Sequence, residues 1–163
     1  MYEDFSNCMS NIGCCYINYI STFKDLMDDS LFGVIMERVS TFMNVDTSLT
    51  ANKFIFNEGV GLCAKLAKYM SVEKTASIFE QVLPVMCERI LADKDNFDLI
   101  SEVFYCFSQY LVKHRDAEFA KMENLLIFAK EALDSCAEDG GDSSLHAFDS
   151  VCGFLAISGE LCG

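Results

Sequence analysis

Cysteine and histidine are the residues of this chain that metal binding or nucleophilic catalysis would use. There are nine cysteines and two histidines, His114 and His146, in 163 residues. A zinc site needs four ligands at finger-like spacing, and a nucleophilic cysteine needs a base beside it. Cys8, Cys14 and Cys15 crowd one segment without a partner cluster. The sequence therefore predicts no enzyme, no cofactor and no metal site.

The more suggestive polar positions have structural interpretations. His114 lies between Lys113 and Arg115 at an expected helix end, where a cation suits the helix dipole. The adjacent pair Cys14 and Cys15 is either a redox pair or ordinary core packing, and we favour packing.

Small residues within apolar patterns are expected to pack helices together. The segment Gly59-Val60-Gly61 has no third glycine and no preceding strand, so close helix packing explains it better than a phosphate loop. Free cysteine behaves as a small buried hydrophobe. On this basis the sequence predicts burial for Cys63, Cys87, Cys106 and Cys152.

Composition excludes several classes of protein. Hydrophobic residues make up 52% of the chain and the net charge is −13. The chain is too apolar for a disordered protein and too acidic for direct binding of a nucleic-acid backbone. Residues 1–5 lack a basic start, and no stretch has the ~18 uninterrupted apolar residues of a membrane span. With an odd cysteine count, we expect a protein of the cytoplasm, the nucleus or both, without a membrane partner.

Apolar residues recur every three or four positions along nearly the whole chain, which predicts an all-α fold. No linker interrupts the pattern, so residues 1–163 are expected to form a single domain. Pro84 predicts a kink inside its helix. The seven predicted helices cover about 3–27, 31–43, 49–70, 72–92, 96–113, 117–136 and a last segment from Asp142 or Ser143 through Leu155. The predicted N-caps are Ser30, Ser48, Ser71, Asp95, Asp116 and Asp142 or Ser143.

The predicted helices come in pairs that resemble one another. Ser48, Asp95 and Asp142 are spaced 47 residues apart, twice over. Cysteines recur inside the first helix of each pair, at Cys15, Cys63, Cys106 and Cys152. Two helices per 40–47 residues is the pattern of HEAT and armadillo repeats. The sequence therefore predicts antiparallel helices stacked as HEAT-like hairpins, an α-solenoid of about three and a half repeats. The alternative is an irregular helical bundle.

Two segments resemble those of a known protein family. They are Asp95-Asn96-Phe97-Asp98-Leu99-Ile100-Ser101-Glu102-Val103-Phe104 and Ser150-Val151-Cys152-Gly153-Phe154-Leu155. Residues from about 46 to 158 resemble part of a nuclear transport receptor of the importin-β/exportin superfamily, most nearly the transportin-SR type. Such receptors have many more repeats than this chain. The resemblance implies a HEAT-repeat scaffold in nuclear transport that binds basic cargo or a small GTPase.

Glutamates recur on the second helix of each predicted pair. Glu80 and Glu123 are 43 residues apart, as are Glu88 and Glu131, and Glu37 occupies the matching position in the first pair. In HEAT solenoids the second helices line the concave face, so these five residues are expected to form an acidic ladder. A ladder of this kind attracts a protein partner with a basic segment, with strong dependence on salt. The alternative is a plain solvated helix face.

A different class of function is the runner-up. Asn57-Glu58-Gly59-Val60 and Glu138-Asp139-Gly140-Gly141 faintly resemble two homology motifs of the Bcl-2 family. That resemblance implies a helical regulator that binds an amphipathic peptide helix in a hydrophobic groove.

The terminal helices are expected contact surfaces for self-association, because apolar residues are frequent in both. In the first helix the aromatic residues are Tyr2, Phe5, Tyr16, Tyr19 and Phe23.

Overall fold

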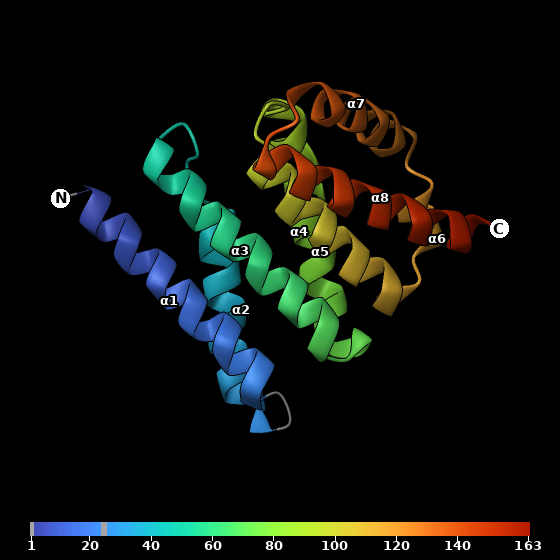
Figure 1. The fold of residues 1–163 in the computed structure, drawn as a ribbon. Coiled ribbons are helices and arrows are strands. Elements are labelled where there is room, and N and C mark those ends of the chain that lie inside the picture. Colours follow the sequence, from blue (N-terminus) through green and yellow to red (C-terminus); the bar gives the residue numbers. More distant parts are fainter. Residues whose placement is uncertain (1, 24–25) are drawn as a thin grey trace. The chain divides into compact units, whose positions relative to one another are not determined.

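The computed structural model describes residues 2–23 and 26–163, without the side chains of residues 2–7, 9, 10, 50 and 51. Within these residues the chain is all-helical and contains no strand, which confirms the predicted all-α class. The helices are α1 (Tyr2–Phe23), α2 (Asp29–Met43), α3 (Thr50–Tyr69), α4 (Val72–Ala92), α5 (Phe97–His114), α6 (Ala117–Ala120), α7 (Glu123–Asp139) and α8 (Asp142–Cys162) (Figure 1).

The predicted helix over 117–136 is wrong, because the structure divides it into α6 and α7 at Lys121 and Met122. The backbone N–H of Lys121 closes α6, and Met122 leaves the helical region with φ −58° and ψ 109°. Met122 fits the apolar spacing but is 41% exposed, whereas Leu125 and Phe128 are buried. The apolar face therefore changes register at this point, which a continuous helix cannot do.

The N-caps of two helices differ from the prediction by one or two residues. Asp28, not Ser30, caps α2 and accepts a hydrogen bond from the Leu31 backbone N–H at 2.8 Å. Asn96, not Asp95, caps α5. A capping side chain must accept a hydrogen bond from a backbone N–H two or three positions ahead. The position of the first helical turn therefore determines which nearby polar residue is the N-cap.

Of the remaining predicted caps, some are confirmed and some are wrong. Ser71 accepts from the Lys74 backbone N–H at 3.4 Å, and Asp116 accepts from that of Phe119 at 3.0 Å, so both predicted caps are confirmed. Asp142 or Ser143 was the predicted cap of α8. Instead Gly141 occupies the cap position, without a side-chain bond. The predicted cap Ser48 is also wrong, because Leu49 occupies the cap position of α3, again without a side-chain bond.

The chain forms two compact units, residues 1–82 and 83–163, and α4 contributes to both. In the first unit α1 and α2 pack on α3. Figure 1 shows α1 and α3 side by side. A Cβ on Gly13 of α1 would lie 2.9 Å from Glu58, and one on Gly61 of α3 would lie 3.2 Å from Ile17. Both contacts pair a residue of α1 with one about 45 positions later, so α1 and α3 run parallel.

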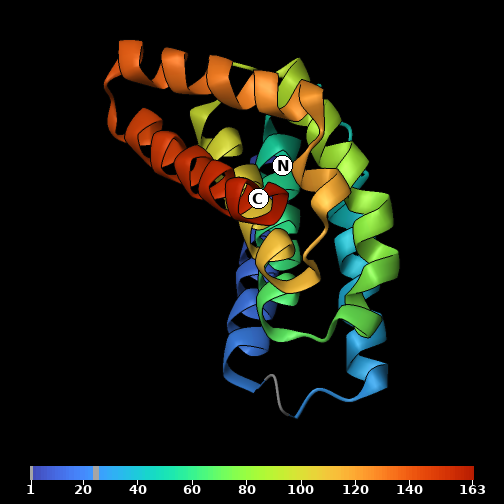
Figure 2. The ribbon, with the colours of Figure 1, turned by 90° about the vertical axis from the view of Figure 1, so that its right-hand side faces the viewer.

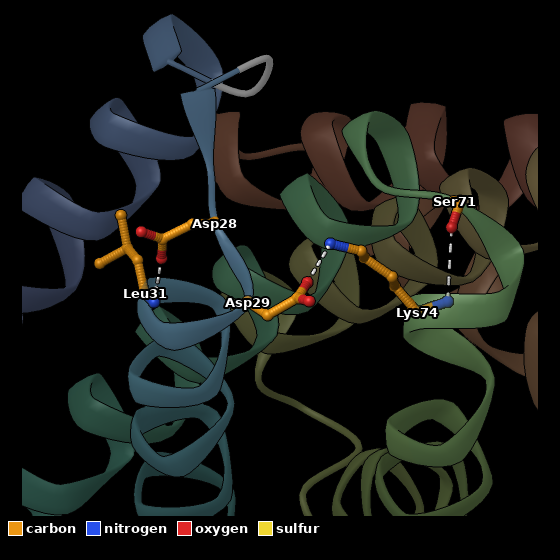
Figure 3. Close-up of polar contacts among 5 residues, drawn as sticks. All are labelled: Asp28, Asp29, Leu31, Ser71 and Lys74. Carbon is orange, nitrogen blue, oxygen red and sulfur yellow. Dashed lines mark hydrogen bonds and ion pairs between the residues drawn. The ribbon is translucent and has the colours of Figure 1, made fainter.

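A polar contact joins α2 to α4 within the first unit. The Lys74 Nζ donates to Asp29 Oδ1 at 2.8 Å (Figure 3) and lies 5.5 Å from the centre of the Phe32 ring. The hydrogen bond and charge of Lys74 lower the pKa of Asp29. Asp29 is also in the first turn of α2, where a negative charge suits the helix dipole.

Glycine at position 59 is required by close helix packing, as the sequence predicted. A Cβ there would lie 2.9 Å from the Cβ of Phe42 and 3.0 Å from the Sδ of Met43. We expect Gly59→Ala to lower the free energy of unfolding by about 1–3 kcal/mol, the usual cost of overpacking. Gly33 of α2 is the matched control, because a Cβ there meets nothing within 4 Å. Gly33→Ala should raise stability by about 0.5–1 kcal/mol through helix propensity. Urea unfolding of both variants tests the packing. Equal changes in the free energy of unfolding would contradict it.

The second unit packs α5, α6 and α7 around α8. Its core is a cluster of phenylalanines, in which Phe104 of α5 lies 5.2 Å from Phe154 of α8 and 6.1 Å from Phe128 of α7, measured between ring centres. Ser101 and Ser150 share a hydrogen bond of 3.2 Å. The Ser101–Ser150 and Phe104–Phe154 contacts pair residues 49 and 50 positions apart, so α5 and α8 also run parallel.

The connection from α7 to α8 is short, as Figure 2 shows in orange and red. Gly140 ends α7 in the left-handed region with φ 67°, a conformation that glycine adopts at low cost.

By length and composition, α8 is the one helix of the described residues that could cross a membrane, with a mean hydropathy of 1.2. Its buried residues recur every three or four positions along one side, at Ser144, Ala147, Val151, Phe154 and Ser158. This is the burial pattern of a helix that packs on neighbours along one face.

Candidate functional site: the acidic second helices

All five glutamates of the predicted ladder are exposed. In the first unit Glu37 lies on α2 and Glu80 on α4, and in the second unit Glu88 lies on α4 while Glu123 and Glu131 lie on α7. The structure records no contact among the five. Each can therefore meet a partner from solvent.

The exposed side of α7 holds more acidic residues than the ladder predicted. At 100° per residue, Glu123, Ile127, Glu131, Asp134 and Glu138 fall within one sector of the helix. All five are exposed, and Ile127 is 51% exposed. We call these five residues the α7 acidic face. Asp134 is absent from the predicted ladder, and Glu138 was expected in the following loop and not on the helix. The signal in the sequence was the spacing of these five residues, at steps of 4, 4, 3 and 4.

Most of the net charge belongs to the second unit. Fifteen of the 25 acidic residues and six of the 12 basic ones lie in residues 83–163, a net charge of −9 out of −13. A partner that approaches this unit therefore meets a negative potential, which attracts basic segments over distances limited by salt screening.

One ladder residue is partly neutralised within the chain. Lys94 Nζ lies 3.0 Å from Glu131 Oε2, with both side chains 54% exposed, and 5.9 Å from the centre of the Phe128 ring. An exposed pair of this kind contributes about 0–1 kcal/mol. Because the pair is weak, a basic partner can displace Lys94 at little cost.

The cysteines divide by burial in a way that partly contradicts the sequence prediction. Cys63 and Cys106 are buried as predicted, and Cys87 is half-buried. Cys15 and Cys152 are exposed, so the prediction that these two pack between helices is wrong. On α1 the close-approach position is Gly13 instead.

The adjacent Cys14 and Cys15 are both free thiols and both exposed, so the core packing favoured for this pair is wrong. The Cys14 Sγ lies 3.7 Å from Glu58 Oε2 on α3. Burial and the charge of Glu58 raise the pKa of Cys14, which reduces its reactivity as a thiolate.

Buried thiols predict a loss of stability in alkali. Burial raises the pKa of Cys63 from 9.0 to about 12. As pH rises above 9, the unfolded chain releases this proton while the folded chain retains it, so stability is complete below pH 9 and falls between pH 9 and 12. Cys63→Ala, which removes one titrating group, should reduce the slope of the unfolding free energy against pH in that window, while Cys87, whose pKa burial raises to about 11, retains part of it. An unchanged slope would contradict the assignment.

His114 differs from its expected role as a helix-end cation. Its ring stacks on Tyr110 at 4.5 Å, and burial lowers its pKa, so the neutral form is favoured at neutral pH. The Tyr110 hydroxyl donates to Asp116 Oδ2 at 2.7 Å. These residues join the end of α5 to the start of α6. His146 is exposed on α8.

The described residues contain no group of three or more His, Cys, Asp or Glu side chains placed to hold a metal ion. Comparisons with known protein families, with curated proteins and with solved structures found no match to this chain.

Proposed function

We propose that the chain is a non-enzymatic protein-interaction module of the HEAT type that binds a partner with a basic segment. The observation that carries this proposal is the α7 acidic face, in which four exposed carboxylates surround an exposed isoleucine. Carboxylates attract Lys and Arg side chains, and Ile127 offers an apolar contact to the same segment. Neither feature requires a catalytic group.

The solenoid arrangement is the finer part of the proposal. In the first unit α1 packs parallel to α3, and α2 also packs on α3. In the second unit α5 packs parallel to α8, and α7 also packs on α8. Stacked helical hairpins produce this order of contacts, because equivalent helices of successive hairpins lie side by side and parallel. Its recurrence in both units supports HEAT-like packing of the helices within each unit.

The resemblance to transport receptors gives the proposal a biological setting. We infer a role as a scaffold in nuclear transport, in the cytoplasm, the nucleus or both, with basic cargo or a small GTPase as the partner. The acidic character of the second unit is consistent with basic cargo.

Fluorescence anisotropy with labelled peptides tests the proposal. A Lys- and Arg-rich peptide with one central leucine should bind, and its affinity should fall as salt rises from 50 to 300 mM. A peptide of the same length with Glu in place of Lys and Arg should not bind. Binding of an uncharged amphipathic helical peptide, with no binding of the basic one, would reject the acidic site and favour the groove of a Bcl-2-like regulator.

A further inference from the structure

The outward side of α1 is an apolar stripe. Gly13, Cys14 and Ile17 of α1 approach residues of α3, which fixes the inward side. Roughly opposite lie Cys8, Ile12, Cys15, Tyr19 and Phe23, at steps of 4, 3, 4 and 4. We call these five residues the α1 stripe. Ile12 is 36% and Phe23 44% exposed, and the Tyr19 and Phe23 rings contact each other at 5.0 Å. Tyr2 and Phe5, also expected on a contact surface, have side chains outside the described residues.

The charge pattern of this helix identifies the occupant of the stripe. Residues 5–23 contain no charged side chain, in a chain whose net charge is −13. Two copies of so acidic a protein repel each other, and an uncharged surface is where they can approach at the least electrostatic cost. A basic partner would gain no ion pair on such a surface. We propose that the α1 stripe binds the α1 stripe of a second copy of this chain, giving a two-fold symmetric dimer.

The residues of the stripe favour an antiparallel pairing. In that register Cys8 faces Phe23 of the second copy, Ile12 faces Tyr19, and Cys15 lies at the two-fold axis beside its own equivalent. The small Cys8 then meets the large Phe23, which fills the ends of the interface better than the Phe23–Phe23 and Cys8–Cys8 contacts of a parallel pair. Antiparallel helix dipoles are also attractive. The spacing suits the shallow crossing of a two-helix seam.

Sedimentation equilibrium of the full chain in reducing buffer is the first test. The protein should dimerise, and Ile12→Glu should raise the dimer dissociation constant about a hundredfold, because each copy would bury a charge in an apolar seam. Asn18→Glu is the matched control, since Asn18 is exposed on α1 outside the stripe. Asn18→Glu should change the dimer dissociation constant less than about threefold, which is a small change in binding free energy. Circular dichroism of both variants checks that α1 stays folded.

Thiol cross-linking tests the same interface without changing its folding. A short bis-maleimide, which alkylates one thiol at each end, should link Cys15 to Cys15 of the second copy. Cys15→Ser should abolish the linked dimer, and Cys14→Ser should leave it intact, because Cys14 faces Glu58.

Three results would overturn the proposal. They are a chain that remains monomeric at every concentration reached, equal effects of the two glutamate substitutions, or a cross-link through Cys152 of α8 in place of Cys15.

Discussion

Replacing Phe104 with alanine is expected to remove about 3–5 kcal/mol from the free energy of unfolding, the usual cost of a large cavity in a core. Phe104 is fully buried and contacts the rings of Phe107, Phe128 and Phe154, so it joins α5 to α7 and α8. Since small domains are stable by about 5–15 kcal/mol, the loss is a large share of the total. No other single substitution considered for this fold should have a larger effect.

Tyr105 provides the control for that experiment. It is the next residue of α5, also aromatic, and 37% exposed. Tyr105→Ala should change stability by less than about 1 kcal/mol, as most surface substitutions do. Urea unfolding followed by circular dichroism at 222 nm measures both variants. If they unfolded at the same urea concentration, the phenylalanine cluster would not be the core of the second unit.

Reversing three charges of the α7 acidic face is expected to weaken binding of a basic peptide between about tenfold and a hundredfold at low salt. The variant is Glu123→Lys, Asp134→Lys and Glu138→Lys. Exposed ion pairs contribute about 0.2–1 kcal/mol each, and reversal replaces each attraction with repulsion. Glu131 is left in place because it pairs with Lys94.

A second triple variant separates a local site from overall charge. Glu118→Lys, Asp149→Lys and Glu160→Lys change the net charge by the same amount at exposed positions on α6 and α8. Peptide affinity should then fall less than about threefold, because a peptide bound along the α7 acidic face makes no direct ion pair with these residues. Equal losses from the two variants would show that net charge, and not the α7 acidic face, attracts the peptide.

Helical periodicity was sufficient to predict the fold class and the bounds of four helices to within a residue or two. The predicted ranges 31–43, 49–70, 72–92 and 96–113 correspond closely to α2, α3, α4 and α5. In these segments apolar residues recur at helical spacing, and polar residues mark the starts of α2, α4 and α5. The break before α7 could not be predicted in this way. Met122 continues the apolar spacing, and its exposure depends on which neighbours Phe119 and Leu125 find in the folded chain.

Burial of single residues was harder to predict where more than one face of a helix is apolar. Cys15 of α1 and Cys152 of α8 fit the same pattern as the buried Cys63 and Cys106, yet both are exposed. Which face turns inward is decided by close contacts such as those of Gly13 and Gly61, and these exist only once α1 and α3 meet.

The candidate site was predicted in part. Glutamates on amphipathic helices were correctly expected to lie on the surface. The ladder was built from residues 43 positions apart on different predicted helices. It therefore did not include Asp134, which lies on the same face as Glu123 within one helix. The proposed binding of a basic partner depends on two properties of the same residues, their negative charge and their exposure on one side of α7. The composition gives only the charge, and the predicted ladder does not place the residues on one side of a single helix.

The most direct test of the central claim is to map a bound basic peptide by amide chemical shifts in NMR spectra of the ¹⁵N-labelled chain. We predict that the largest shifts will follow the exposed side of α7, around Glu123, Ile127 and Asp134, with further shifts at Glu88. Shifts concentrated at Asn57–Val60 of α3, or spread evenly over every acidic surface, would contradict the proposal that the second helices form the binding site.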